Sequence, residues 1–226
     1  MKAIILAAGL GTRMRPLTDT LPKPLLQAGG QALIEYHLHN LVRAGITDIV
    51  INHYHLGEKL EAALGDGSRY GARIQYSRET VRLETAGGIV KALPLLGDEA
   101  FAVISGDIWT DFDYCHLRPV DGETTLARLL MVHNPEHHQH GDFSLRPDGR
   151  LALKAPEAED GLTYAGISVM HPRLFANLPE APLALRPVLD AAIAAGHIEA
   201  EQYTGQWFDI GTPERLAELD TLLRNG

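Results

Sequence analysis

The first 24 residues carry the residue types that bind a chain of phosphates. An apolar run from Ala3 to Ala8 predicts a buried strand, and the segment after it is rich in glycine and positive charge. Its candidate phosphate-binding residues are Gly9, Gly11, Thr12, Arg13, Arg15 and Lys23. Glycine lets the backbone approach a ligand closely, and consecutive free N–H groups after a strand bind phosphate. The pattern predicts a triphosphate-binding loop that also includes Ala8.

The spacing of the glycines excludes two common phosphate-binding loops. A dinucleotide-binding fingerprint requires a third glycine three positions after Gly11, where Met14 stands. A Walker A loop requires a Gly-Lys-Ser/Thr triplet, which this segment lacks. The loop therefore belongs to another class of nucleotide-binding site.

Two aspartates far apart in the sequence are candidate metal ligands. Asp107 follows a predicted strand directly, and Asp209 precedes a predicted helix that begins near Pro213. Two hard oxygen donors suit Mg²⁺ when the phosphates of a substrate complete its coordination. The alternative is that Asp209 serves only as the cap of the following helix. Together with the phosphate-binding loop, the pair favours a magnesium site.

The elements that must position these residues follow from hydrophobic periodicity. We expect strands at 3–8, 48–52, 73–77, 101–105, 126–132, 143–145, 150–153 and 164–170, and helices at 32–44, 58–64, 88–96, 185–195 and 213–223. The alternation predicts an α/β fold with a mostly parallel central sheet flanked by helices, and a smaller antiparallel part after residue 125. Gly9, Glu79 and Asp107 each follow a strand, so we expect them to converge at the carboxyl edge of the sheet.

Composition limits the class of protein. A chain of 226 residues with 45% hydrophobic residues fits one domain, 1–226. We expect a nucleotide-binding half at 1–120 and, at 121–226, a half that binds the second substrate, called the acceptor half below. The lone Cys115, with no signal sequence and no membrane-length apolar run, predicts a cytoplasmic protein without a membrane partner. A net charge of −9 argues against a broad nucleic-acid-binding surface. The oligomeric state stays open.

The pattern L-A-A-G-x-G-T-R-x-x-P-L-T at 6–18, with P-K-P at 22–24, resembles the opening of the sugar-1-phosphate nucleotidyltransferases. This resemblance implies a Rossmann-like nucleotidyltransferase fold and a reaction between a nucleoside triphosphate (NTP) and a sugar 1-phosphate that releases pyrophosphate. Arg13 would bind the β- and γ-phosphates, and Lys23 the α-phosphate and the sugar phosphate. The motifs G-D and W-x-D-I-G-T-P would supply Asp107 and Asp209 as ligands of a Mg²⁺ cofactor.

The segment 79–88 resembles the base-binding loop of this family, with Glu84 in place of a glycine. The resemblance assigns Thr85 and Gly87 to the nucleotide, and Glu79 to the upstream position that holds the base. A carboxylate accepts hydrogen bonds from uracil, thymine or guanine and suits adenine poorly. The sequence does not separate uracil from guanine.

The acceptor half departs from the family pattern. Many relatives have Glu-Lys-Pro before Asn-Ala-Gly, where this chain has Lys154-Ala155-Pro156 and then Tyr164-Ala165-Gly166. We expect the sugar phosphate to contact Asp107, Lys154, Tyr164 and Gly166. The exchange of a carboxylate for Lys154 favours an anionic sugar, although Lys154 can also be read as a solvated surface lysine.

With these features, the chain is most similar to family members that use UTP and N-acetylmuramic acid 1-phosphate in peptidoglycan recycling for the cell wall. Mannose-1-phosphate guanylyltransferase and glucose-1-phosphate thymidylyltransferase remain alternatives, and a cytidylyltransferase for a non-sugar phosphate is more distant. A non-catalytic nucleotide-binding regulatory subunit is a further alternative. The tract from His133 to His140 allows a transition-metal site, which we consider less favoured because no cysteine or patterned carboxylate joins it.

Overall fold

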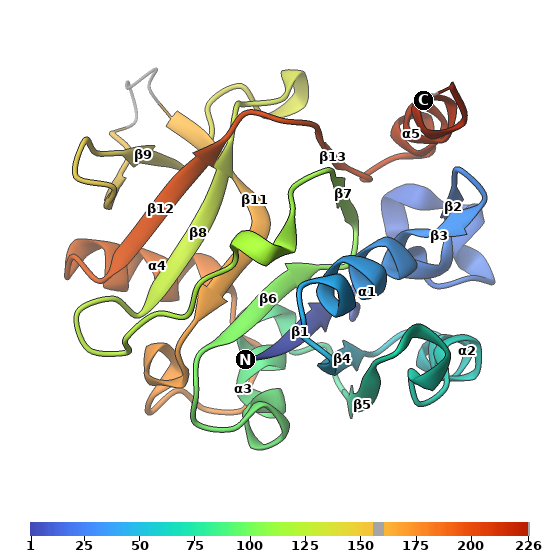
Figure 1. Ribbon diagram of the computed structural model, residues 1–226, viewed down its shortest axis with the longest axis horizontal. Helices are drawn as coiled ribbons and strands as arrows, with labels where there is room; N and C mark the ends of the chain where they lie inside the picture. Colours follow the sequence, from blue (N-terminus) through green and yellow to red (C-terminus); the bar gives the residue numbers. More distant parts are fainter. Residues whose placement is uncertain (156–160, 226) are drawn as a thin grey trace.

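The computed structural model describes residues 1–155 and 161–225. Nine strands form its main sheet: β1 (Lys2–Leu6), β4 (Asp48–His53), β5 (Arg73–Arg78), β6 (Phe101–Ser105), β8 (Ala127–Val132), β9 (Phe143–Leu145), β10 (Leu151–Leu153), β11 (Gly161–Met170) and β12 (Ile198–Tyr203). Seven of them follow the order β10-β9-β11-β6-β1-β4-β5, and β8 and β12 extend from β11 (Figure 1). The sheet is mixed: β6, β1, β4 and β5 form a parallel group on one side of β11, and β12 also pairs in parallel with β8.

The parallel part contains β6, β1, β4 and β5. In its centre, Ile5 pairs with Ile51 of β4 and Ile104 of β6. Runs of branched apolar residues are typical of strands that are covered on both faces. The antiparallel part begins at β11, which runs against β6, β8 and β9. The prediction of a mostly parallel sheet with a smaller antiparallel part is confirmed.

Helices cover both faces of the sheet: α1 (Leu33–Arg43), α2 (Gly57–Leu64), α3 (Glu84–Leu96) and α4 (Leu185–Ala194). Successive strand residues point to opposite faces. Ile5 packs in the cluster with α1 and α2, and its neighbour Ile4 packs in the cluster with α3 and α4. The resulting three-layer arrangement leaves the carboxyl edge of the parallel strands open for a ligand.

Near its C-terminus, the chain returns to the N-terminal part of the fold. The short strand β13 (Trp207–Asp209) pairs antiparallel with β7 (Ile108–Thr110), and α5 (Pro213–Asn225) then lies beside the hairpin of β2 (Gln27–Ala28) and β3 (Gln31–Ala32) (Figure 1). The N–H of Gly29 donates a hydrogen bond of 2.8 Å to Asp220 of α5. This return carries residues near 209 to the carboxyl edge of the sheet.

Several strands were not predicted, and β12 shows why. Its sequence, Ile-Glu-Ala-Glu-Gln-Tyr, has little of the β-branched character that marks a strand. It forms because β8 offers a free edge, with which it pairs in parallel over six residues. The pairing is reinforced by Arg128 of β8, whose Nη2 lies 2.7 Å from a carboxylate oxygen of Glu199.

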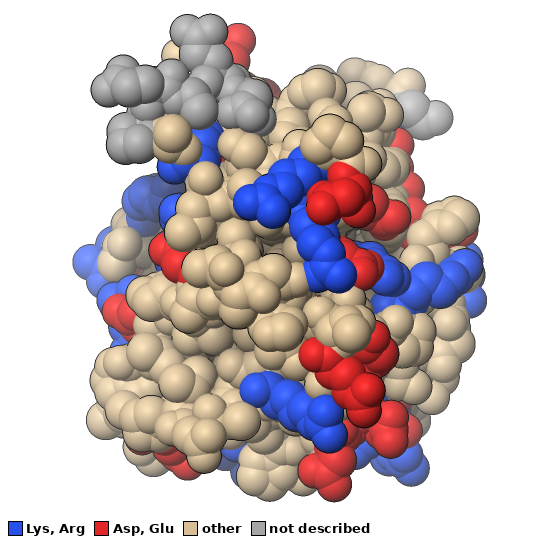
Figure 2. Space-filling view, turned by 90° about the vertical axis from the view of Figure 1, so that its left-hand side faces the viewer, with Lys and Arg blue, Asp and Glu red and all other residues tan. Residues whose placement is uncertain are grey.

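Within the ranges that the structure describes, no helix has the length and hydrophobicity needed to cross a bilayer. On the face drawn in Figure 2, acidic and basic side chains lie interspersed among uncharged areas, so this face presents no continuous basic patch.

A buried histidine beneath β7 predicts how stability depends on pH. His37 is 1% exposed, its Nδ1 lies 2.8 Å from the Tyr114 hydroxyl, and burial lowers its pKa from 6.5 to about 4. Between these values the unfolded chain binds a proton that the folded chain excludes. The free energy of unfolding should therefore fall, by on the order of 3 kcal/mol, as the pH drops from 6.5 to about 4.

Urea unfolding at several pH values in this range tests the prediction. The His37→Gln variant should show a shallower pH dependence than the wild type, whatever its stability at pH 7. An equal pH dependence of the free energy of unfolding in the two proteins would show that His37 does not cause the loss of stability at acidic pH.

Candidate active site

A cavity of about 860 Å³ lies at the carboxyl ends of β1, β4 and β6 and extends toward β11 and α4. This is a size typical of small-molecule sites, and the location is the usual one in an open α/β sheet. Nine of the sequence-predicted site residues line it: Ala8, Gly9, Arg13, Lys23, Thr85, Asp107, Tyr164, Gly166 and Asp209. The other six, which do not line it, are Gly11, Thr12, Arg15, Glu79, Gly87 and Lys154.

The loop after β1 has the backbone expected of a phosphate site. The N–H groups of Gly9, Leu10 and Gly11 donate no hydrogen bond to any other residue in the described ranges. Gly11 adopts φ +63°, and its carbonyl accepts a 2.7 Å hydrogen bond from the Thr18 hydroxyl. Gly11 therefore shapes the turn, and Gly9 faces the cavity with unpaired donors beside it.

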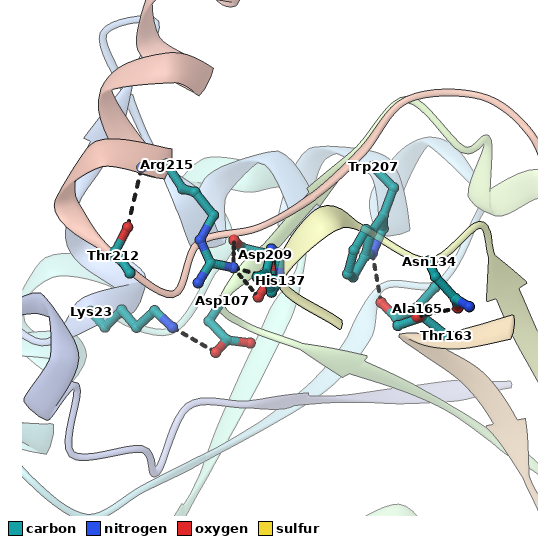
Figure 3. A network of polar contacts seen from close by, with 10 residues as sticks. All are labelled: Lys23, Asp107, Asn134, His137, Thr163, Ala165, Trp207, Asp209, Thr212 and Arg215. Atoms are coloured by element: carbon teal, nitrogen blue, oxygen red, sulfur yellow. Dashed lines mark hydrogen bonds and ion pairs between the residues drawn. The ribbon is translucent and has the colours of Figure 1, made fainter. Parts of the chain in front are cut away.

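Lys23 is held at the cavity wall. It begins a short 3₁₀ turn (Lys23–Leu25), preceded by Pro22 and continued by Pro24, so its backbone has little freedom. The residue is only 9% exposed, and its Nζ lies 2.6 Å from Oδ2 of Asp107 (Figure 3). These contacts distinguish Lys23 from a solvated lysine and make it a positioned charge inside the site.

The two predicted metal ligands come together through the return of the chain. Asp209 is paired with Ile108 in the β13–β7 ladder, and the N–H of Ile210 donates a 2.8 Å hydrogen bond to the carbonyl of Asp107. The first turn of α5 is capped by Thr212, whose hydroxyl accepts from the N–H of Arg215 at 3.4 Å. Asp209 is therefore not the cap of that helix.

The carboxylate of Asp209 lies between the side chains of His137 and Arg215, and the sequence analysis predicted neither contact. Its Oδ1 lies 2.9 Å from Nε2 of His137, and its Oδ2 lies 2.5 Å from Nη1 of Arg215 (Figure 3). The histidines of the tract from His133 to His140 contact different residues: His138 lies 3.2 Å from Asp142, and His133 lies 3.2 Å from Gln202. Only tertiary folding brings position 137 to position 209, so no local pattern could have indicated it.

The donors at this edge fit a hard divalent cation whose remaining ligands come from substrate. Both Asp107 and Asp209 line the cavity, and both are carboxylates. Within the described residues, no group of three or more histidine, cysteine, aspartate or glutamate side chains is arranged to hold a metal. A two-carboxylate set that depends on substrate phosphates is the arrangement that Mg²⁺ commonly uses.

Glu79 lies one layer behind the cavity rather than in its wall. Its Oε1 accepts a 2.7 Å hydrogen bond from Nδ2 of Asn52, and its Oε2 accepts one of 3.1 Å from the N–H of Leu83. Burial raises its pKa, against the opposing effect of these two hydrogen bonds. Asn52 is the residue that faces the cavity, and its Oδ1 also accepts a 3.0 Å bond from the N–H of Ala7. The network ties the phosphate-binding loop to the predicted base-binding loop.

This network predicts a large effect for Asn52→Leu, which has a similar volume and no polar atoms. The substitution leaves the Ala7 N–H and one Glu79 oxygen buried without partners, and we expect a loss of about 2–4 kcal/mol in the free energy of unfolding. Urea unfolding at pH 7 measures it. The control is Asn40→Leu on α1, where no described side-chain hydrogen bond is lost and the change should stay within about 0.5 kcal/mol. Equal effects would contradict the proposed network.

The predicted base-binding loop enters α3 with an unusual backbone. Glu84 has φ +59°, a region that favours glycine, which explains why the family pattern has glycine at this position. Glu84 and Thr85 both line the cavity. A β-carbon at Gly87 would collide with the carbonyl oxygen of Ala181, so Gly87 permits close packing against the segment before α4.

The acceptor side is built from β9, β11 and α4. Gly166 has φ +75°, and a β-carbon there would lie 2.7 Å from the Ser105 hydroxyl, so only glycine fits between β11 and β6. Trp207 closes this side, with its indole N–H donating a 2.9 Å hydrogen bond to the carbonyl of Ala165 (Figure 3). Lys154 follows β10 outside the lining of the cavity, and Pro156 of its motif lies outside the described residues. The predicted contact of Lys154 with the sugar stays a prediction.

Comparison with known proteins agrees with this architecture. Residues 2–141 match the nucleotidyl transferase family model. The chain is 47% identical to an N-acetylmuramate alpha-1-phosphate uridylyltransferase of Neisseria meningitidis, covering 98% of both chains. It is 35% identical to the enzyme of the same name from Caulobacter vibrioides, over 96% of this chain and 97% of the relative. A mannose-1-phosphate guanyltransferase of Aspergillus fumigatus is 31% identical, over 95% of this chain and 62% of that protein.

A solved structure supports the fold. A putative glucose-1-phosphate thymidylyltransferase from Bacillus anthracis, in complex with sucrose, superposes with a TM-score of 0.86 at 23% identity, covering 100% of this chain and 96% of that one. At that identity the similarity shows the fold alone. With the family match and the long, closely similar relatives, the chain belongs to the sugar-1-phosphate nucleotidyltransferases of the nucleotidyl transferase family.

Proposed function

We propose that this protein transfers UMP from UTP to N-acetylmuramic acid 1-phosphate, forming the UDP-sugar and pyrophosphate. The observation that carries the proposal is the convergence of Arg13, Lys23, Asp107 and Asp209 on a cavity that also has an acceptor side. The choice of substrates is supported by the two uridylyltransferase relatives, which match the chain over nearly its full length.

The reaction needs no nucleophile from the protein. An oxygen of the sugar phosphate attacks the α-phosphorus, a new P–O bond forms, and the bond to the β-phosphate oxygen breaks as pyrophosphate leaves with the electron pair. Arg13 and the free N–H groups after β1 bind the triphosphate, and Lys23 holds the α-phosphate against the incoming sugar phosphate. Such catalysis consists of alignment and charge stabilisation. Mg²⁺, held by Asp107 and Asp209, would supply further neutralisation of the phosphoryl oxygens.

The proposed organisation is one domain with two halves that share the cavity. Residues up to about 120 hold the nucleotide, and the later part holds the sugar, with β13 and α5 returning Asp209 to the nucleotide side. Because UTP is a cytoplasmic metabolite and the lone Cys115 is free, we place the protein in the cytoplasm. The product is a nucleotide sugar for peptidoglycan recycling.

Guanylyl transfer to mannose 1-phosphate is a second candidate, because the Aspergillus relative is 31% identical. A non-catalytic regulatory subunit is less well supported, since such a protein would not need a positioned lysine and two carboxylates in one cavity.

Pyrophosphate release, measured with Mg²⁺ present, tests these functions. UTP, dTTP, GTP and CTP are each combined with the 1-phosphates of N-acetylmuramic acid, N-acetylglucosamine, glucose and mannose. Maximal kcat/KM with UTP and N-acetylmuramic acid 1-phosphate is the expected result. A maximum with GTP and mannose 1-phosphate would replace the proposal by the second candidate, and release with no pair would favour a regulatory protein.

A further inference from the structure

The acceptor side of the cavity differs in charge from the nucleotide side. Among the described residues that line the cavity, the arginines and lysines are Arg13, Lys23, Arg82 and Arg186. The first three belong to the phosphate-binding loop, the Pro-Lys-Pro turn and the loop before α3. Arg186 belongs to α4, on the opposite side of the cavity, where its neighbours in the lining are mostly apolar: Phe143, Ala184, Leu185 and Leu189.

The other charged groups on this side have protein partners, as Arg186 has in Asp190. Asp142 accepts a 2.8 Å hydrogen bond from the N–H of Tyr164 and lies 3.2 Å from Nε2 of His138. His137 contacts Asp209 and Arg215, beside the predicted metal ligands. Among the described lining residues, Arg186 is the one arginine or lysine on this side, so a negatively charged group on the sugar would meet its permanent positive charge there.

Arg186 has a half-exposed side chain, 52% accessible, that makes two contacts with neighbouring residues. Its guanidinium carbon lies 4.6 Å from the centre of the Phe143 ring, a distance at which a cation attracts the face of an aromatic ring. Its Nε donates a 2.6 Å hydrogen bond to Oδ1 of Asp190, one turn further along α4. Neither Nη nitrogen donates to a residue in the described ranges. The paired N–H groups of the two Nη nitrogens remain for a ligand, in the geometry that binds a carboxylate with two parallel hydrogen bonds.

We propose that Arg186 determines specificity for the acceptor by binding the carboxylate of an acidic sugar 1-phosphate. For N-acetylmuramic acid 1-phosphate this group is the lactyl carboxylate, so the proposal rests on the proposed function. It assigns to Arg186 the role that the sequence analysis expected of Lys154. Arg186 contacts the sugar substituent and takes no part in the bond-making step.

The test compares two acceptors that differ only in the lactyl group, N-acetylmuramic acid 1-phosphate and N-acetylglucosamine 1-phosphate. Kinetics with UTP are measured for the wild type, Arg186→Gln, Arg186→Lys and Lys154→Gln, which tests the rival assignment of the carboxylate. Where turnover of N-acetylglucosamine 1-phosphate is slow, its inhibition constant against the muramic substrate replaces KM.

We expect Arg186→Gln to lower kcat/KM for the muramic acceptor by about 10- to 100-fold, mainly through KM, because a charge-assisted hydrogen-bond pair is lost. The glucosamine acceptor should change less than about threefold, which also shows that the variant is folded. Arg186→Lys should recover part of the loss, and Lys154→Gln should keep the wild-type preference for the muramic acceptor.

Equal losses with both acceptors would overturn the proposal and give Arg186 a merely structural role. A loss confined to Lys154→Gln would return the carboxylate to Lys154. If the wild type itself shows no preference for the muramic acceptor, the proposed function fails. A wild-type preference that survives in Arg186→Gln overturns the role of Arg186 alone.

Discussion

Replacing Lys23 with alanine should lower kcat by about 10²–10³-fold, the range for removing one preorganised charge-stabilising group. The expectation follows from its position, because the residue is 9% exposed and its amine lies 2.6 Å from Asp107 at the wall of the cavity. In such a partly desolvated site a positive charge acts on the phosphoryl group more strongly than it would in water. Steady-state pyrophosphate release at saturating substrates measures the effect.

Arg15→Ala is the matched control for Lys23→Ala. Arg15 belongs to the same N-terminal segment, but its side chain is exposed, pairs with Asp19 at 3.2 Å and does not line the cavity. Its loss should change kcat by less than about twofold, because an exposed ion pair contributes little. An unchanged kcat in Lys23→Ala, or equal losses in both variants, would remove Lys23 from the catalytic role.

The Asp209→Asn variant should require far more Mg²⁺, with the concentration for half-maximal activity raised on the order of 100-fold. Changes in groups that merely orient metal ligands cost 10- to 100-fold, and a ligand itself should lie at the upper end. Asparagine keeps the shape of the side chain, so the β13–β7 pairing should remain. Titration of activity with Mg²⁺ at fixed UTP measures the shift.

Thr212→Ala separates a metal ligand from a helix cap. Thr212 accepts the hydrogen bond from the N–H of Arg215 at the start of α5, and its loss should cost about 1 kcal/mol of stability without changing the Mg²⁺ requirement. Asp209→Asn should therefore change the Mg²⁺ requirement, whereas Thr212→Ala should change only the stability. An Asp209→Asn protein that loses thermal stability but keeps the wild-type Mg²⁺ curve would show that Asp209 is structural.

The ends of the predicted strands indicated which edge of the sheet holds the functional site. They did not indicate which side chains line the cavity, as Glu79 shows. Glu79 does follow β5, as expected, yet the neighbouring strand places Asn52 between it and the cavity. The signal for Asn52 was present, because it lies near the end of the predicted strand beside β1. Which of two polar residues reaches the cavity depends on register, and Leu6 pairs with Asn52.

The sequence by itself determined the phosphate-binding loop, the Pro-Lys-Pro turn and the parallel core, because each depends on residues close together in the chain. Local apolar periodicity places the strands, and glycine and proline shape the backbone between them. The tertiary structure alone decided which distant side chains meet. Asp209 reaches Asp107 through the β13–β7 pairing, and His137 contacts Asp209 across 72 positions of the sequence. Arg186 reaches the cavity from α4, whose Leu185 and Leu189 share a core cluster with Phe143. Such contacts depend on strand register and helix packing, and these come from burial over the whole chain rather than from any local pattern.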